Sequence, residues 1–210
     1  HVIRVEEVQD IREAYQGAHL LVAPIYGSGG TRYKNFEAFA SGLPVITTSV
    51  GIGGTDATDG VDVIVRDEPL EIAKAAIDLL EDLNAPAYKI ASFEVIDLPL
   101  IKYAASTGKP VIISTGMADA EEIAEAIEAV HEGGCKELAV LHCVSGYPAP
   151  AEDYNLRTIP DMIERFGLVT GLSDHTLDNT TAIARVALGA SIIEKHFTLC
   201  RNGGGPDDSF

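Results

Sequence analysis

The sequence predicts an α/β fold made of parallel βαβ units, and three observations lead to this prediction. Short apolar β-runs alternate with amphipathic helical runs along most of the 210 residues, as in sheets whose strands are joined by helices. Runs such as 111–113 and 138–141 are continuously apolar, which is typical of parallel strands buried on both faces. Helix boundaries are marked as well, since Asp119 offers an N-cap to one helical run and Gly133 ends it.

The predicted elements follow one another in a regular order. The candidate strands are Val2–Val5, His19–Ala23, Pro44–Thr47, Val61–Val65, Tyr88–Ala91, Val111–Thr115, Leu138–Cys143, Leu168–Leu172 and Ser191–His196. The candidate helices are Asp10–Gln16, Thr31–Ala40, Leu70–Asp82, Pro99–Ser106, Ala120–Glu132, Thr158–Arg165 and Asn179–Leu188. A closed (β/α) barrel has eight strands, so nine candidates indicate more than one ordinary barrel. A change of composition near Leu83–Pro86 predicts a boundary there between two domains.

The composition excludes several classes of partner. A formal net charge of -17 argues against binding to nucleic acid or to an anionic membrane surface. The sequence has no apolar run near the ~20 residues that span a bilayer. Its three cysteines, Cys135, Cys143 and Cys200, form no CxxC pair, which favours a reduced, cytoplasmic setting. Because the sequence begins at His1 and not at Met, we expect it to be a piece of a longer chain.

Two histidines end neighbouring strand-like runs in the last third of the chain. His175 follows the run that contains Ser173, and His196 follows the run that contains Glu194. Adjacent parallel strands lie ~5 Å apart, and side chains two positions apart share a face. Each histidine therefore brings a polar companion to the same side of the sheet. The pattern predicts a divalent-metal site at the carboxyl edge of the sheet, whereas a lone strand-end histidine is more often structural, as we expect for His142.

Residues 85–210 resemble the sialic acid synthase (N-acetylneuraminate synthase) family. Synthases of pseudaminic, legionaminic and spore-coat sugars look similar, so the resemblance defines a reaction better than a substrate. The matching stretches, in order, are Tyr88–Ser92, Ser106–Pro110, Ser114–Met117, Leu141–Cys143 with Tyr147–Pro148, Gly171–Thr176, Glu194–Thr198 and Gly205–Asp207. The resemblance implies a TIM-type (β/α) barrel and the condensation of phosphoenolpyruvate with a 2-acetamido sugar such as N-acetylmannosamine.

The resemblance also assigns roles to single residues. His175 and His196 would ligate Mn²⁺ or Mg²⁺, with water and substrate oxygens as further ligands. The phosphate and carboxylate of phosphoenolpyruvate would be held by Lys89, Ser92, Ser114 and Ser173. Tyr147 and Asp207 would contact the acceptor sugar. Ser145, which stands where many family members have asparagine, would also bind substrate, and the exchange would alter how the carboxylate is recognised. Lys89 has a second interpretation, in which it merely pairs with a carboxylate at the barrel floor.

Only part of the family barrel is matched, from its fourth strand onward. The family's first three strands carry a catalytic glutamate and a further lysine, and nothing in this sequence matches them, so the catalytic residues stay unknown. The small carboxyl-terminal antifreeze-like domain that reaches over a partner's active site in the family dimer is not matched either, although a homodimer stays an option. We therefore expect an enzyme fold that is inactive as given.

Residues 1–82 resemble the donor-binding, Rossmann-like domain of GT-B retaining glycosyltransferases. The resemblance rests on a glycine-rich loop at 27–30 and on the string K-x-x-E-A-x-A-x-G-x-P-V that begins at Lys34. A glycine loop before a helix amino terminus suits phosphate, although such a loop also serves as a plain turn. By resemblance, Arg32 and Lys34 would meet the diphosphate of a nucleotide sugar, and Glu37 would meet its ribose. The position eight residues before Glu37 is Gly29, so the paired-glutamate form is absent.

The chain therefore reads as a composite: a glycosyltransferase fragment joined to a partial (β/α) barrel. A designed chimera, a fusion of neighbouring genes and an artefact of assembly all remain open, as does a fold without activity. Five parallel strands leave two open sheet edges. The leading segment either pairs with such an edge or forms a small sheet of its own, and we expect the latter, with two α/β lobes.

Overall fold

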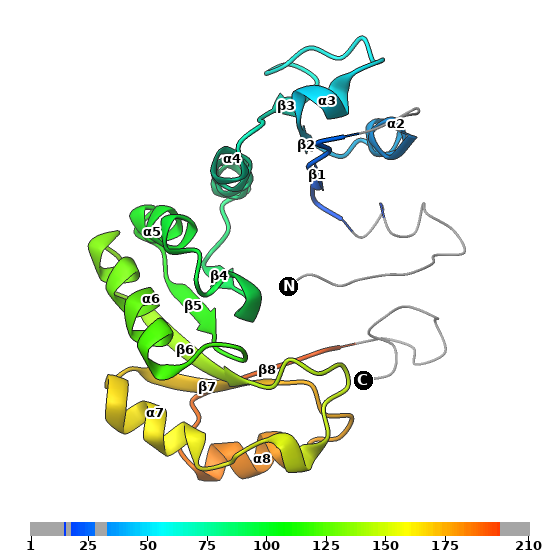
Figure 1. Ribbon diagram of the computed structural model, residues 1–210. Helices are drawn as coiled ribbons and strands as arrows, with labels where there is room; N and C mark the ends of the chain where they lie inside the picture. Colours follow the sequence, from blue (N-terminus) through cyan, green and yellow to red (C-terminus); the bar gives the residue numbers. More distant parts are fainter. Residues whose placement is uncertain (1–14, 16–17, 28–32, 198–210) are drawn as a thin grey trace. The chain divides into compact units, whose positions relative to one another are not determined.

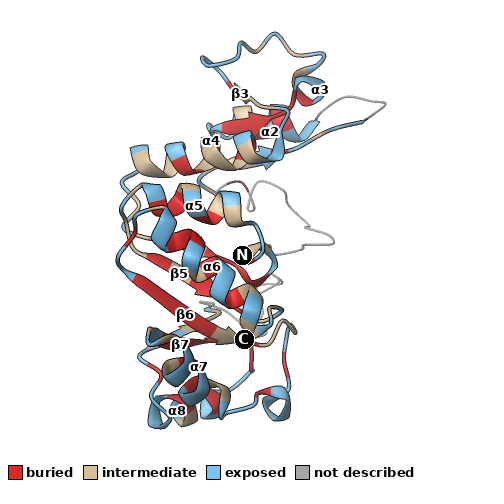
Figure 2. Cartoon of the chain, turned by 60° about the vertical axis from the view of Figure 1, so that its left-hand side comes forward, coloured by how far each residue is buried: buried red, intermediate tan, exposed pale blue. Residues whose placement is uncertain are grey.

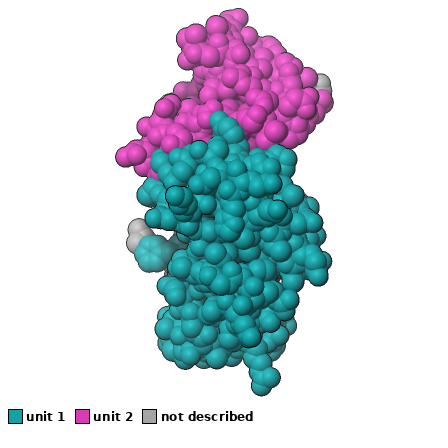
Figure 3. All heavy atoms as spheres, turned by 90° about the vertical axis from the view of Figure 1, so that its left-hand side faces the viewer, with its two compact units in different colours: residues 1–5, 86–210 teal, residues 6–85 magenta. Residues whose placement is uncertain are grey.

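A computed structural model describes residue 15 and residues 18–27 and 33–197. The chain divides into two compact units, one formed by residues 6–85 and the other mainly by residues 86–210 (Figure 3). The described strands form two parallel sheets, one of three strands and one of five. The predicted α/β class with a partial barrel is therefore confirmed.

The first unit is a three-stranded parallel sheet with helices on both faces (Figure 1). Side chains of neighbouring positions on its middle strand alternate between the faces. Val45 packs with Ala38 and Tyr15 on one side, and Ile46 packs with Ile72 and Ala75 on the other. The elements are β1 (Leu21–Ala23), α2 (Tyr33–Ala40), β2 (Val45–Thr47), α3 (Ser49–Ile52), β3 (Ile64–Val65) and α4 (Pro69–Asp82).

The second unit is a five-stranded sheet whose strands follow in chain order, β4-β5-β6-β7-β8, with every pair parallel. Right-handed crossovers between strands in this order place all the connecting helices on one face, which is the arrangement of a barrel arc. The strands are β4 (Tyr88–Ile90), β5 (Val111–Ser114), β6 (Leu138–Cys143), β7 (Val169–Asp174) and β8 (Ile192–Lys195). The helices are α5 (Leu98–Ser106), α6 (Ala120–Glu132), α7 (Thr158–Phe166) and α8 (Thr180–Ala187), and short 3₁₀ turns occupy Ser92–Glu94 and Ala151–Asp153.

The core of the second unit lies between the sheet and these helices. Figure 2 shows buried residues along β5, β6 and β7 and on the sheet-facing sides of the helices. Helix α6 begins with a reciprocal capping box, in which Asp119 accepts from the backbone N–H of Glu122 and the Glu122 side chain accepts from that of Asp119. The close approach of α6 to α5 needs Gly133, because a Cβ there would lie 2.5 Å from the Cβ of Ala105.

Several predicted boundaries are corrected by the structure. Strand β7 continues to Asp174 although its last two residues are polar, because backbone pairing with β8 does not depend on side-chain polarity. Residues 61–63 lie in a turn and a bridge before β3 and not in a strand. The helix α3 was not predicted, and its N-cap is Thr48, whose side chain accepts from the N–H of Gly51.

Two predicted elements cannot be compared, since the Val2–Val5 strand and all but Tyr15 of the Asp10–Gln16 helix fall outside the described residues. Among the helices that the structure describes, none is long and apolar enough to cross a bilayer.

Candidate functional site

The two histidines lie together at the carboxyl ends of β7 and β8. Parallel pairing sets Ser173 opposite Glu194, so the residues two positions later, His175 and His196, reach equal heights on the same face. Their ring centroids are 5.2 Å apart with an interplanar angle of 65°. The register of one strand pair therefore creates the arrangement that the sequence predicted.

His175 is held rigidly and presents one defined nitrogen. Its Nδ1 lies 2.7 Å from the carbonyl oxygen of Val144. Because a carbonyl only accepts, Nδ1 carries the proton and Nε2 carries the lone pair that a metal needs. Burial lowers the pKa of His175, and the bond to Val144 opposes that shift only in part. The neutral form, which is the ligating form, is thus favoured.

The backbone of His175 is fixed on both sides as well. Its N–H donates to the hydroxyl oxygen of Tyr154 at 2.8 Å, and its carbonyl accepts from the N–H of Ala149 at 2.9 Å. Tyr154 is itself buried, and burial is the largest cause that raises its pKa to about 12. The hydroxyl therefore stays protonated and neutral at physiological pH.

Tyr147 joins the two histidines from the loop after β6. Its ring centroid lies 4.0 Å from that of His175, with an interplanar angle of 33°, and 5.6 Å from that of His196. Half of the Tyr147 surface is exposed. The ring thus lies against both histidines while the residue stays half exposed to solvent.

Lys89, at the middle of β4, makes an ion pair with Glu194. The Lys89 Nζ lies 2.6 Å from Glu194 Oε1, and the lysine side chain is 24% exposed. Burial raises the pKa of Glu194, but hydrogen bonds from Lys89 and Ser173 outweigh it and keep that pKa below its usual value. Glu194 Oε2 is buried without a hydrogen-bond partner. The pairing of Lys89 with a carboxylate, one of its two interpretations, is thus observed.

The remaining serines lie at the carboxyl ends of neighbouring strands. Ser92 Oγ accepts from the N–H of Gly116 at 3.0 Å. The hydroxyls of Ser114 and Ser145 are buried and have no hydrogen-bond partner in the described part of the chain. A Cβ at Gly116 would lie 2.7 Å from Ser145 Oγ. Buried hydroxyls are normally satisfied, so these two fit a polar ligand or water.

The histidine pair has no third protein ligand among the described residues. No group of three or more His, Cys, Asp or Glu side chains there is placed to hold a metal ion. Cys143 Sγ lies 4.0 Å from Nδ1 of His175. This is the protonated nitrogen and not the one that would bind a metal, so the thiol is not a suitable third ligand. A metal on His175 and His196 would complete its coordination with oxygen atoms of water or substrate, as hard divalent ions prefer.

The nucleotide-sugar residues predicted in the first unit are only partly visible. Arg32 lies outside the described residues, as does Asp207 of the second unit. Lys34 and Glu37 lie on the exposed side of α2. The hydroxyl of Tyr15 donates to Glu37 Oε2 at 3.1 Å. The structure thus brings Glu37 to Tyr15, and Lys34 lies one turn before Glu37 on α2, where its carbonyl also accepts from the Tyr15 hydroxyl at 3.2 Å.

Comparison with known proteins assigns the two parts of the chain to two families. Residues 70–210 match the NeuB family, and residues 1–82 match the glycosyl transferases group 1 family. The chain belongs to the NeuB family. Its NeuB part is 47% identical over 135 residues to the pseudaminic acid synthase of Helicobacter pylori, a match that covers 64% of this chain and 40% of that protein. The spore coat polysaccharide biosynthesis protein SpsE of Bacillus subtilis is 43% identical over 139 residues, covering 65% and 37%. The chain therefore spans about two fifths of the length of these relatives.

Solved structures of the NeuB type extend the likeness. The crystal structure of SpsE from Bacillus subtilis matches with a TM-score of 0.63 and 30% identity, over 91% of this chain and 62% of that one. The sialic acid synthetase of Leptospira borgpetersenii, solved with citrate, matches with a TM-score of 0.62 and 25% identity, over 95% and 70%. The composite of a glycosyltransferase fragment and a synthase barrel is thus shown at the level of family.

Sequence reasoning missed the layer behind the NeuB histidines. Asp174, Arg185 and Tyr154 are buried there, and the Arg185 guanidinium lies 5.7 Å from the centre of the Tyr154 ring. Burial and Arg185 together lower the pKa of His142 to about 4. An arginine within a helical run is normally taken for a solvated residue, so the sequence held no signal for this layer.

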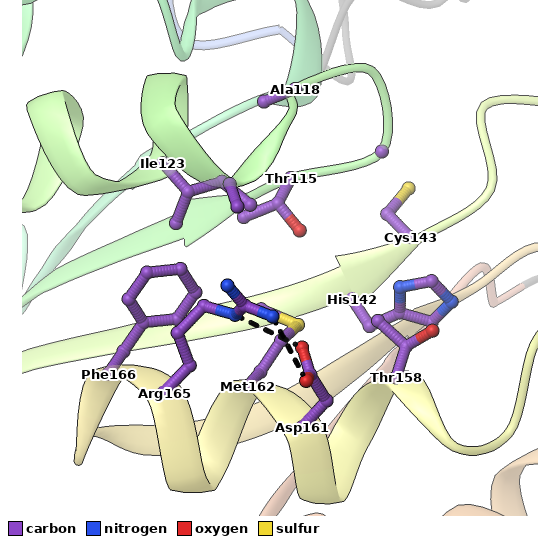
Figure 4. A pocket seen from close by; sticks show the side chains of 12 residues that line it. Thr115, Ala118, Ile123, His142, Cys143, Thr158, Asp161, Met162, Arg165 and Phe166 are labelled. Atoms are coloured by element: carbon purple, nitrogen blue, oxygen red, sulfur yellow. Dashed lines mark hydrogen bonds and ion pairs between the residues drawn. The ribbon is translucent and has the colours of Figure 1, made fainter.

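A cavity of about 280 Å³ opens between α6 and α7, on the helix side of β5 and β6 (Figure 4). His142, Cys143 and Thr115 line it together with apolar side chains of both helices. On its α7 wall, Arg165 and Asp161 form an ion pair at 3.2 Å one helical turn apart, with both side chains about half exposed. Neither metal-site histidine lines this cavity, so the candidate site and the cavity are separate features of the NeuB part.

Proposed function

We propose that residues 86–210 carry part of a synthase site, which binds a divalent metal and phosphoenolpyruvate for condensation with a 2-acetamido sugar. The observation that carries the proposal is the pair of adjacent imidazoles at the carboxyl ends of β7 and β8. Its support from relatives is the family match and the names of two similar proteins, a pseudaminic acid synthase and an N,N'-diacetyllegionaminic acid synthase.

The protein's own groups fit such a ligand set. His175 and His196 would hold Mn²⁺ or Mg²⁺, which when bound supplies Lewis-acid polarisation of the sugar aldehyde. The unpartnered hydroxyls of Ser114 and Ser145 would donate to phosphate or carboxylate oxygens. A hydroxyl can donate to an anion, but it does not offset the net charge of -17, so the positive charge of the proposed site comes from Lys89 and the metal.

Lys89 can serve both interpretations of its role. An ammonium group has three donors, and the observed contact to Glu194 Oε1 uses one of them. We propose that Lys89 keeps this contact while a phosphate oxygen takes a second donor. Glu194 would then orient the ammonium group and Ser173 would bridge toward the ligand. Tyr147, whose ring lies against both histidines, and Asp207 would contact the acceptor sugar.

Binding without turnover is the expected behaviour of these 210 residues. No residue of the described part is assigned as the general base, and the family's first three strands have no match in this sequence. An assay for product from phosphoenolpyruvate, N-acetylmannosamine and Mn²⁺ tests this expectation, and clear turnover would contradict it.

The decisive experiment is a thermal melt with and without Mn²⁺ plus phosphoenolpyruvate. Ligand at about 100 times its Kd stabilises a competent site by about 2.7 kcal/mol. We expect an upward shift of Tm for the unaltered chain, its loss in His175→Ala, and its retention in His131→Ala, which removes an exposed histidine of α6. A cooperative melt without any shift would overturn the proposed site.

A second function rests on the first unit and its match to glycosyl transferases group 1. We propose that Lys34 and Glu37, together with Arg32, bind a nucleotide sugar through its diphosphate and ribose. Thermal protection by UDP- or CMP-type nucleotides, lost in Glu37→Gln, would support this function. Protection that survives in Glu37→Gln would contradict the assigned role of that carboxylate.

Cellular setting and assembly remain proposals too. Cys135 and Cys143 are buried free thiols, which supports the proposed cytoplasmic setting. We keep the homodimer as a further proposal, and the molecular mass from light scattering tests it.

A further inference from the structure

The residues that precede the two histidines are themselves joined across the strands. Asp174 and Lys195 are register partners in the β7–β8 pair. Since side chains alternate along a strand, these two project from the face opposite to His175 and His196. Asp174 Oδ2 lies 3.0 Å from Lys195 Nζ. The Asp174 side chain is fully buried, and that of Lys195 is 20% exposed.

The same ion pair also holds the turn that follows β7. Asp174 Oδ1 accepts from the N–H of Thr176 at 3.0 Å, and Lys195 Nζ donates to the Thr176 carbonyl. His175 therefore lies between two residues that are both bound to Lys195. Lys195 precedes His196 in the chain, so its side chain links the backbone beside His196 to the residues on either side of His175.

We propose that Asp174 and Lys195 are a positioning pair, which fixes the separation of the two imidazoles from the opposite face of the sheet. The inference rests on the proposed metal site, and it names the residues that give the site its geometry. An ion pair this buried is a poor source of net stability, since desolvation offsets its attraction. A role in specifying one arrangement of the two strand ends explains why such a pair is present here.

Exposed ion pairs of the same unit provide the contrast. Lys102 and Glu132 pair across α5 and α6 with side chains 50% and 53% exposed, where solvent weakens the interaction. Lys102→Met is thus a matched control: it removes a lysine from an ion pair of the same unit at a place without contact to the histidines.

The test combines three readouts on Asp174→Asn, Lys195→Met, the double variant and Lys102→Met. The readouts are the Mn²⁺ Kd from EPR of free Mn²⁺, the Tm, and the NOE between ring protons of His175 and His196 in the metal-free protein. Loss of outer contacts to metal ligands typically weakens metal binding about 10- to 100-fold. We expect that increase of Kd in both single variants, together with loss of the NOE and a lower Tm.

The double variant separates positioning from plain stabilisation. Removing both charges leaves neither Asp174 nor Lys195 without its partner, so its Tm should recover part of the loss. The rest of the loss stays, because the buried Arg185 also loses the attraction of the Asp174 carboxylate. If the pair positions the histidines, the Kd stays raised and the NOE stays absent in spite of that recovery. Return of the Kd and the NOE together with the Tm would overturn the proposal, as would an effect of equal size in Lys102→Met.

The outcome also distinguishes failure of the metal site from failure of the positioning pair. An unaltered chain that shows the NOE but binds no Mn²⁺ contradicts the proposed function, and the NOE in the variants still decides the pair. If one single variant does not fold, the other single variant and the double variant give the same decision.

Discussion

The two units are both built from parallel βαβ elements, but they differ in how their strands place the predicted ligand residues. The first unit has strands of two or three residues, and its predicted ligands among the described residues, Lys34 and Glu37, lie on one helix. The second has strands of up to six residues, and its predicted ligands stand at the ends of adjacent strands. Strand register brings side chains together over long sequence separations, and in the second unit it places His175 beside His196. In the described part of the first unit, Lys34 and Glu37 lie one turn apart on the same helix.

The strongest test of this contrast compares Leu172→Ala in β7 with Ile46→Ala in β2. Both side chains are fully buried, so each truncation should lower the free energy of unfolding by about 2–5 kcal/mol. Leu172 packs against Tyr154 and Ala149, which hold His175. We therefore expect Leu172→Ala to weaken Mn²⁺ binding and Ile46→Ala to leave it unchanged, as measured by titration below the Tm of each variant. Equal loss of binding in both would break the comparison.

A second test uses pH, since the second unit carries a buried histidine behind its site. The pKa of His142 is lowered from 6.5 to about 4 by burial and by Arg185. The unfolded chain therefore binds the proton first as pH falls. The contribution of neutral His142 to the free energy of unfolding is therefore fully present above pH 6.5. It is lost as the pH falls from 6.5 to about 4, and the loss is about 3 kcal/mol at most.

Urea unfolding at pH 7 and pH 5 measures this loss. We expect His142→Gln to remove the part of the pH dependence that falls in that window, with His131→Gln as the exposed control on α6. Identical pH dependence in the unaltered chain and in His142→Gln would contradict the assignment.

A smaller effect is expected from the hydroxyl behind His175. Tyr154→Phe keeps the ring but removes the acceptor of the His175 N–H. Leaving a buried donor unsatisfied costs about 1–3 kcal/mol, and amide exchange at His175 should accelerate. The matched control is Tyr88→Phe, which removes a buried tyrosine hydroxyl at the start of β4. Unchanged exchange at the His175 amide in Tyr154→Phe would show that this hydroxyl does not hold the turn.

The sequence predicted an element correctly where the residues that define its ends lie in the element itself. Helix α6 was predicted residue for residue, because Asp119 and Gly133 mark its ends locally. Strand β7 was cut short because Ser173 and Asp174 are polar, and only pairing with β8 extends it. Local patterns thus locate elements, whereas register is a property of two segments together.

The site shows the same division. His175 and His196 were predicted from strand ends, and the contact of Lys89 with a carboxylate was one of two interpretations. The partner Glu194 was not foreseen, since nothing in β4 points to β8. Arg185 and Tyr154 were missed altogether: Arg185 of α8 is buried over the ring of Tyr154, and no local pattern links two residues 31 positions apart.

The smallest expected effect compares helix starts in the two units. Helix α6 begins with the capping box of Asp119, while α4 of the first unit begins after Glu68, which makes no side-chain cap. Glu68 has the extended backbone that an N-cap residue adopts, with φ -86° and ψ 133°, and Pro69 follows it as a favourable first helical residue. Glu68→Ser should therefore add about 0.5–1 kcal/mol to the stability of the first unit, whereas Asp119→Ala should remove about 1 kcal/mol from the second. Chemical denaturation followed by a probe in each unit measures both changes. If Glu68→Ser gives no gain although Asp119→Ala gives its loss, the start of α4 is limited by its packing on β2 and not by its cap.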